Sequence, residues 1–221
     1  MLESGFEITE EFISKQDIAL ILSDLDGLHL EERRGGIRNI EKKSARVLEY
    51  ATSSSMLNTA EQYLSGAPKL VRAIYFNKTP SNNWLVTWHQ DKTVSVSEKF
   101  EEQGWSTWSV KDHTHHVQPP LFVLDEMVTF RVNLDASTLE TGCLKVIPNS
   151  HTLGILGQED IDEFVDVADV FLCSAAIGSA LVMRPHILHS SSKATSPSHR
   201  RVLHLEYSSY SLPQGVTWAS S

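Results

Sequence analysis

Hydrophobic residues in the first third of the chain recur at the spacing of amphipathic helices. Four apolar side chains of residues 15–25 fall on one helical face: Ile18, Ile21, Leu22 and Leu25. Ser14 precedes this run as an N-cap, with Asp17 at the third helical position as in a capping box, and Gly27 follows it as a stop signal. The pattern predicts one helix between Ser14 and Gly27.

Two shorter helices are expected before residue 68. One covers about residues 43–51, and a polar loop with two glycines, LEERRGGIRN, separates it from the first helix. The other runs from about Ser54 to Leu64, and the helix-breaking sequence Gly66-Ala67-Pro68 ends it. Residues 1–67 are therefore predicted to form a helical N-terminal part.

After Pro68 the pattern changes to short runs rich in β-branched and aromatic residues. These runs are LVRAIYF, WLVTW, TVSVS, MVTFRVNL, CLKVI, SALVM and RVLHLEY, and turn-forming residues separate them. Many short strands with little helix between them predict an antiparallel barrel or sandwich over residues 68–210. The acidic segment 158–171 is expected to be a solvated helix or loop on the surface.

Composition narrows the class of protein. The 221 residues predict a single domain over 1–221, and the formal charge of −9 comes without a basic stripe, so nucleic acid is not an expected partner. No apolar run is long enough to span a membrane, and the N-terminus does not look like a signal peptide. Two cysteines outside any metal-binding pattern fit a reducing, cytoplasmic location.

A histidine and an aspartate interrupt the strand-like run WLVTWHQDKTVSV. Because side chains alternate along a strand, His89 and Asp91 point to the same face. An inward carboxylate needs a partner charge or a metal. A third ligand would complete the face of two histidines and one carboxylate that is typical of non-haem Fe(II) oxygenases. With ten histidines in the chain, however, such a tripeptide arises readily by chance.

Two other histidine–acid pairs compete with it. His29-Leu30-Glu31 lies in a polar loop, whereas His204-Leu205-Glu206 lies on an expected strand and is the stronger rival. The C-terminal stretch offers a third metal ligand in either His186 or His189, which would face opposite sides of a strand. Arg200-Arg201 then opens the next strand, where one arginine could bind a ligand carboxylate through two hydrogen bonds.

Three stretches in order, WHQD, MVTFRVNLDASTLETGCLKVIPNSH and LHSSS…HRRVLH, resemble the phytanoyl-CoA dioxygenase family of Fe(II)- and 2-oxoglutarate-dependent oxygenases. The resemblance covers residues 68–208, with Asn149 where the family's PGSH-like motif has glycine. It implies a mainly β fold, a double-stranded β-helix (a jelly-roll or cupin-like barrel) with the N-terminal helices packed on one side. It also implies an enzyme that uses Fe(II), 2-oxoglutarate and O₂ to hydroxylate a small molecule, releasing succinate and CO₂.

Carried over position by position, the resemblance implies that His89, Asp91 and His189 are the iron ligands. Arg200, eleven residues after His189, falls where the family's arginine holds the distal carboxylate of 2-oxoglutarate, and Ser191 matches a hydroxyl that helps to hold it. Related halogenases have a small residue at the carboxylate position. The presence of Asp91 therefore favours hydroxylation, although desaturation and ring chemistry use the same ligands.

Several residues keep open roles. His186 is expected to be a surface imidazole or a neighbour of the metal ligands, and Arg201 to face solvent or an acidic partner. Arg72 and Arg131 lie on expected strands, and paired arginines on the barrel surface are favoured over pocket residues. His116 belongs to the HTHH run, expected to be a solvated loop.

A second class of function remains open from the residues. The same barrel could hold a redox-silent metal, or none, and act as a small-molecule binding protein or an isomerase without 2-oxoglutarate turnover. Arg200 separates the two classes, because only an oxygenase needs a carboxylate clamp beside the metal. The loops around residues 97–120 and 150–172, which would choose the substrate, carry no readable motif, and the oligomeric state cannot be read either.

Overall fold

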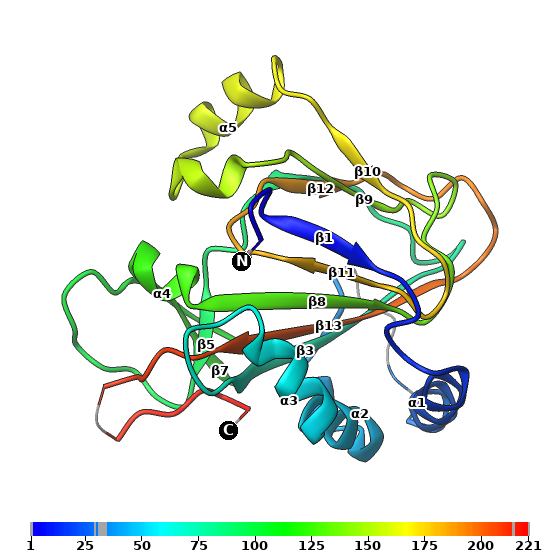
Figure 1. The fold of residues 1–221 in the computed structure, drawn as a ribbon, viewed down its shortest axis with the longest axis horizontal. Coiled ribbons are helices and arrows are strands. Elements are labelled where there is room, and N and C mark those ends of the chain that lie inside the picture. Colours follow the sequence, from blue (N-terminus) through cyan, green and yellow to red (C-terminus); the bar gives the residue numbers. More distant parts are fainter. Residues whose placement is uncertain (1, 29, 31–34, 214, 221) are drawn as a thin grey trace.

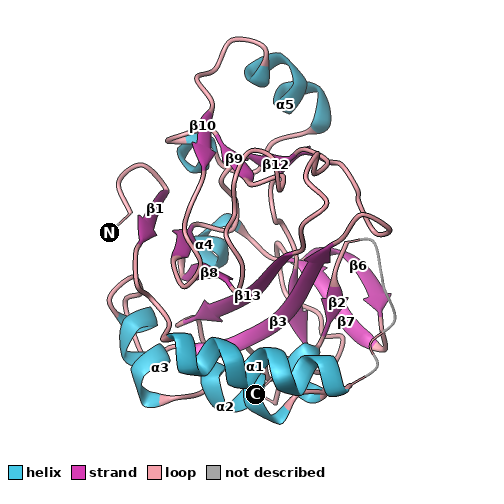
Figure 2. Cartoon of the chain, turned by 90° about the vertical axis from the view of Figure 1, so that its right-hand side faces the viewer, coloured by secondary structure: helices cyan, strands magenta, loops and turns pink. Residues whose placement is uncertain are grey.

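The computed structural model of the chain describes residues 2–28, 30, 35–213 and 215–220. Its strands form three antiparallel sheets, with helices on the outside (Figure 1). The two larger sheets face each other across the molecule, and three helices cover the outer side of the largest sheet (Figure 2). This is the predicted double-stranded β-helix with N-terminal helices packed on one side, so the predicted fold class is confirmed.

The largest sheet has six strands. In spatial order they are β1 (Phe6–Thr9), β11 (Ala180–Met183), β8 (Met127–Asn133), β13 (Arg200–Ser208), β3 (Lys69–Lys78) and β2 (Ile37–Arg38). The central strand β13 pairs with β3 from Arg200 opposite Lys78 to Ser208 opposite Lys69. It pairs with β8 on its other side.

Two smaller sheets complete the barrel. The four-stranded sheet has the order β10 (Phe171–Cys173), β9 (Leu144–Val146), β12 (His189–Ser191) and β4 (Val86–His89). The three-stranded sheet has the order β5 (Val94–Val96), β7 (Thr114–Gln118) and β6 (Ser106–Lys111). Segments more than 90 residues apart thereby become neighbours, because β4 pairs directly with β12.

Helices fill the connections. They are α1 (Lys15–Gly27), α2 (Ala45–Ala51), α3 (Ser54–Glu61), α4 (Leu121–Asp125) and α5 (Gln158–Val165), with short 3-10 turns at Ile40–Lys42 and Ser150–Leu153. As predicted, the Ser14 hydroxyl accepts the Asp17 N–H at 3.1 Å and caps α1. None of the described helices is both long and apolar enough to cross a membrane.

The two faces of the six-stranded sheet have opposite character, because side chains alternate along each strand. The outward positions of β8 and β13 are apolar, as at Phe130 and Leu205, and pack against Ile21 and other residues of α1 to α3. Positions between them, such as Arg131 and His204, face the barrel interior and line its cavity. The large core therefore lies between sheet and helices, which leaves the interior free for polar chemistry.

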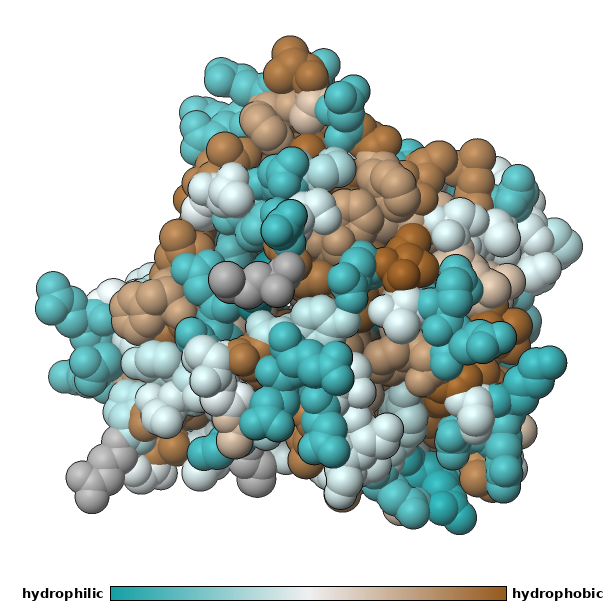
Figure 3. Space-filling model, in the orientation of Figure 1, coloured by the Kyte–Doolittle hydropathy of each residue, from teal (hydrophilic) through white to brown (hydrophobic). Residues whose placement is uncertain are grey.

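The structure corrects several local predictions. The described part of residues 1–67 contains the strands β1 and β2 besides the helices α1, α2 and α3. The HTHH run belongs to β7 and the turn before it instead of a loop. The acidic segment is, as predicted, a largely exposed surface helix, α5, and exposed apolar side chains follow it, including Val167 at 84% exposure. Apolar and hydrophilic residues alternate over this region of the surface (Figure 3). The assignment of residues 1–221 to one domain stays a prediction.

Candidate active site

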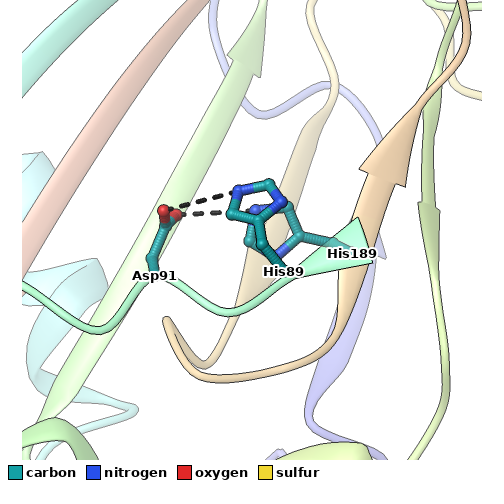
Figure 4. Close-up of side chains that lie close together, drawn as sticks. All are labelled: His89, Asp91 and His189. Atoms are coloured by element: carbon teal, nitrogen blue, oxygen red, sulfur yellow. Dashed lines mark ion pairs between the residues drawn. The ribbon is translucent and has the colours of Figure 1, made fainter. Parts of the chain in front are cut away.

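Two imidazoles and one carboxylate meet where β4 and β12 lie side by side. β4 ends at His89, which stands opposite His189 at the start of β12, and Asp91 follows β4. Each histidine Nε2 lies near a different oxygen of Asp91, at 3.7 Å for His89 and 3.6 Å for His189 (Figure 4). The ring centroids of the two histidines are 4.2 Å apart. One possible ligand atom from each residue lies within 4.8 Å of the others.

Gln90, which lies between His89 and Asp91 and points away from both, holds the end of β4 in place through its hydrogen bonds. Its buried side-chain amide donates to the carbonyl oxygens of His186, at 2.8 Å, and Gly154, at 2.7 Å. Its amide oxygen accepts the N–H of Leu156 at 2.9 Å. The Asp91 N–H donates to the carbonyl of Pro185. The end of β4 is therefore tied to the segment that leads into β12.

The orientation of both imidazoles is set by the main chain. Nδ1 of His89 lies 2.8 Å from the Thr87 carbonyl oxygen, and Nδ1 of His189 lies 2.9 Å from that of Ile187. Because a carbonyl only accepts, each Nδ1 must carry the proton, which leaves a lone pair on each Nε2. Both lone pairs belong to the nitrogens nearest Asp91. A backbone partner of this kind is usual for histidines that bind metals.

The charge states suit a divalent cation. Burial, followed by the charge of His89, lowers the pKa of His189 to about 3, so its imidazole is neutral at pH 7. Burial alone would raise the pKa of Asp91, but His189, His89 and nearby cations outweigh it and hold that pKa well below its usual range. Two imidazole nitrogens beside a carboxylate are the donor set of facial non-haem iron sites. These three residues therefore fit ferrous iron.

A cavity of about 220 Å³ opens onto the three residues. Five basic side chains line it: Arg38, Arg72, Lys111, Arg131 and Arg200. Among the described residues that line it, Asp91 is the only acidic one. Since the whole chain carries a formal charge of −9, this positive lining is a local feature that favours anionic ligands.

The two adjacent arginines at the start of β13 face opposite sides of the strand, as the alternation of side chains predicted. Arg200 is 3% exposed and lines the cavity together with Ser191. Arg201 faces outward and binds both carboxylate oxygens of Asp135 at 2.8 Å. Burial and then the charge of Arg131 lower the pKa of Arg200 to about 9, and its Nε has no hydrogen-bond partner.

Arg72 and Arg131 line the cavity and are buried, so their predicted placement on the barrel surface is wrong. Arg72 forms an ion pair with Glu206 at 2.7 Å. Arg131 donates to Nδ1 of His204 at 3.0 Å. Both arginines occupy inward positions of the large sheet, and alternation alone could not tell which face of that sheet would be enclosed.

The rival pair His204 and Glu206 takes part in this arginine network. A guanidinium only donates, so Nδ1 of His204 must accept from Arg131, and Nε2 therefore carries the proton. This Nε2 donates to Glu206 at 2.8 Å. Although Asp91, His204 and Glu206 lie close enough for a metal site, both nitrogens of His204 are engaged and two arginines flank it. The competing pair His29 and Glu31 lies outside the described residues.

Two other histidines are buried. His186, expected either on the surface or as a neighbour of the metal ligands, is fully buried, so the surface alternative is wrong, and its Nε2 lies 3.3 Å from Asp125. His116 is not solvated but 2% exposed on β7, with its Nδ1 3.5 Å from Arg72. Neither lines the cavity.

Sequence reasoning missed the buried Lys78, and it also missed Arg38 and Lys111, which line the cavity. Lys78 lies at the end of β3, is fully buried, and contacts Ser191 at the edge of the cavity. A signal was present, because Arg72, Ile74 and Phe76 precede it on the inward side at a period of two. Lysine at such a position is rarely buried without a partner, and that could have marked it.

Comparisons with known proteins agree with this architecture. Residues 1–202 match the family model described as phytanoyl-CoA dioxygenase (PhyH). The epimerase SnoN from nogalamycin biosynthesis, solved with Fe³⁺, alpha ketoglutarate and nogalamycin RO, superposes with a TM-score of 0.70 at 14% identity, over 98% of this chain and 82% of that one. At sequence identities this low, structural similarity establishes the fold alone.

Two further solved structures share it. AviO1 from Streptomyces viridochromogenes Tue57 has a TM-score of 0.69 at 17% identity, over 96% of this chain and 93% of that one. EctD from S. alaskensis, with bound Fe, has a TM-score of 0.67 at 16% identity, over 93% of this chain and 73% of that one. A search of curated protein sequences finds no match.

Proposed function

The chain belongs to the phytanoyl-CoA dioxygenase family, and we propose that it hydroxylates a small molecule in a reaction that depends on Fe(II) and 2-oxoglutarate. Iron, 2-oxoglutarate and O₂ are the cofactors and cosubstrates of this family. The observation that carries the proposal is the meeting of a facial metal-binding set and an unpaired buried arginine in one cavity. The cytoplasmic location of the protein stays a prediction.

His89, Asp91 and His189 would hold the iron on one side, leaving its other side toward the cavity. Bound iron and 2-oxoglutarate supply the oxidising power, with succinate and CO₂ as by-products. The residues bind and orient the reactants and exclude bulk water. Asp91 fills the carboxylate position, which supports hydroxylation over halogenation.

Arg200 and Ser191 would hold the distal carboxylate of 2-oxoglutarate. Both line the cavity and both are buried. No described carboxylate pairs with Arg200, so its charge is available to a ligand. Because 2-oxoglutarate must share about 220 Å³ with the substrate, only a small substrate, or the reacting end of a larger one, fits beside it.

Replacing Arg200 with alanine should raise the KM for 2-oxoglutarate about 10- to 100-fold, because a hydrogen bond to a charged group contributes about 1.5–3 kcal/mol. The kcat at saturating 2-oxoglutarate should fall much less, since no metal ligand is removed. Initial rates of succinate formation measure both constants. Arg201→Ala is the matched control, because Arg201 pairs with Asp135 outside the cavity and its loss should leave KM unchanged. Equal KM effects in the two variants would contradict the assignment of Arg200.

The proposed reaction is tested by screening a small-molecule library for substrate-dependent succinate release and reading the product masses. Hydroxylation predicts a product heavier by one oxygen atom. A ring-closed or isomerised product with succinate release would retain the oxygenase chemistry but reject hydroxylation. Absence of succinate with every compound, despite bound iron, would favour the binding protein or isomerase instead.

A further inference from the structure

Two basic side chains stand where the cavity opens to solvent, away from the proposed 2-oxoglutarate site. Arg38 of β2 is half-buried and Lys111, at the end of β6, is exposed, and both line the cavity. In the sheet register, Arg38 stands beside Ile74 of β3. Arg200 stands opposite Lys78, four residues further along β3. At about 3.3 Å per residue, the two arginines are roughly 13 Å apart along this strand.

Arg38 and Lys111 belong to different sheets, and Asn39 joins those sheets. Its side-chain amide donates to the Thr114 hydroxyl at 3.0 Å and to the Asp112 carbonyl oxygen at 3.4 Å. β2 therefore lies beside β7 (Figure 2). Nη1 of Arg38 lies 3.9 Å from the Asp112 carboxylate, in the turn that follows Lys111. These contacts hold the two basic side chains at one opening, called here the basic mouth.

The donors of the basic mouth are available to a ligand. The 3.9 Å between Arg38 and Asp112 exceeds hydrogen-bond length, and an exposed ion pair of this kind contributes little. Among the described residues, no side-chain hydrogen bond engages Arg38 or Lys111. Arg72 belongs to the same lining, and its buried Nε has no partner there, although its Nη2 pairs with Glu206. Because buried N–H groups without an acceptor are rare, this part of the cavity is short of acceptors.

Electrostatics groups the same side chains. Burial lowers the pKa of Lys111, and the charges of Arg38 and Arg72 lower it further. The pKa of Arg200 responds to the charge of Arg131 instead. The cavity thus holds two groups of cations, and only the group that contains Arg200 has a partner in the proposed 2-oxoglutarate complex.

The positive charge of the basic mouth is not used by the proposed metal and cosubstrate. Fe(II) and the dianion 2-oxoglutarate carry opposite charges of equal size, so binding both leaves the excess of basic over acidic lining residues as it was. Asp91 is assigned to the metal and Arg200 to the distal carboxylate. Since basic side chains placed together repel one another, a further anion at the mouth would be attracted.

We propose that Arg38 and Lys111 form a subsite for an anionic group of the substrate, a carboxylate or a phosphate. This inference rests on the proposed function and names its substrate class, a small acid. The inward side chains of Ile74 and Phe76 line the cavity beside this subsite and offer an apolar wall to the carbon skeleton. The acid group stays at the mouth, and the carbon to be hydroxylated lies deeper, toward the metal ligands.

The test uses three small probes of similar size: butanoate, its neutral amide butanamide, and propyl phosphate. Each is titrated by calorimetry, anaerobically and at low ionic strength, into protein loaded with Fe(II) and saturating 2-oxoglutarate, so that Arg200 is already occupied. At least one anion should bind about tenfold more tightly than butanamide. Whether butanoate or propyl phosphate shows the larger preference identifies the acid. About 1 M salt should remove most of the preference, because the mouth is open to solvent.

A double variant locates the binding. Arg38→Gln with Lys111→Met should weaken the preferred anion about tenfold or more and leave butanamide and 2-oxoglutarate within about twofold. Arg46→Gln with Lys99→Met is the matched control, because it removes the same two charges from exposed positions outside the cavity. The control should weaken the anion by less than about twofold, since charges far from the site are screened.

Equal weakening of the anion in the two double variants would reduce the effect to net charge and overturn the inference. Equal loss of butanamide binding in the cavity variant would show a structural role and overturn it too. The wild type alone is also decisive: equal affinity for all three probes, or no binding of either anion, contradicts the subsite whether or not a variant folds. Iron and 2-oxoglutarate binding are measured before any probe is added, so their failure is a separate result that rejects the proposed function and the inference with it.

Discussion

Replacing Asp91 with alanine should lower succinate release by more than about 100-fold, because even side chains that only orient metal ligands account for about 10–100-fold in affinity or activity. Asp91 is the single carboxylate of the proposed iron site and lies within 3.7 Å of both histidines. Without it, the two imidazoles face several cations with no carboxylate between them. Iron bound per chain, measured by metal analysis, should fall together with activity.

Asp169→Ala is the matched control for this variant, because Asp169 is exposed in the segment after α5. It should leave iron content and succinate release unchanged. If the Asp91→Ala protein retained stoichiometric iron and normal turnover, the assignment of the metal ligands would be wrong. A loss of activity with iron retained would instead limit the role of Asp91 to the chemistry of the bound metal.

The second large effect is on stability. Glu206→Ala should lower the free energy of unfolding by about 3–5 kcal/mol, because removing one partner of a buried ion pair leaves the other charge uncompensated. Glu206 is 1% exposed and accepts from both Arg72 and His204. For a chain of this size, each kcal/mol lowers Tm by about 2–4 °C, so a fall of roughly 10 °C is expected in thermal unfolding.

An exposed ion pair in the same chain offers the comparison. Arg46 and Glu49 lie 2.6 Å apart but are largely exposed, and Glu49→Ala should change stability by less than about 1 kcal/mol. Similar losses in the two variants would show that the Arg72–Glu206 pair is solvated, contrary to its burial. Glu206→Gln keeps the volume and one acceptor, so its loss should fall between those of the two alanine variants.

The contribution of Glu206 should also depend on pH. Burial alone would raise the pKa of Glu206, but Arg72 and His204 outweigh it and hold the folded-state pKa below the usual 4.5. A carboxyl group with a lowered folded-state pKa stabilises the fold above its unfolded value and loses that effect as acid protonates it. The stability difference between wild type and Glu206→Gln in urea should therefore be full at pH 7 and shrink as the pH falls below about 4.5.

Much of the site could be anticipated because its determinants are local. The i, i+2 spacing places His89 and Asp91 on one face, and adjacent positions must separate Arg200 from Arg201. The choice of His189 over His186 required the family resemblance, since strand alternation allowed either. The structure brings His189 to the other two and leaves His186 beside Asp125.

The rest depended on contacts that no local pattern contains. β1 is four residues long and pairs with β11, more than 170 residues away. β7 contains the polar sequence THHVQ, whose burial comes from β5 and β6 on either side. Arg72 and Arg131 were placed on the surface because charged strand positions usually face water, whereas in this barrel they face the cavity.

The central claim is that His89, Asp91 and His189 hold ferrous iron with 2-oxoglutarate chelated beside Arg200. The most direct measurement is the visible absorption spectrum after anaerobic addition of Fe(II) and 2-oxoglutarate. We expect a weak charge-transfer band from the iron–keto acid chelate in the wild type, appearing only at higher 2-oxoglutarate concentration in Arg200→Ala, and absent in Asp91→Ala. A wild-type protein that binds one iron per chain yet shows no such band at saturating 2-oxoglutarate would contradict the account.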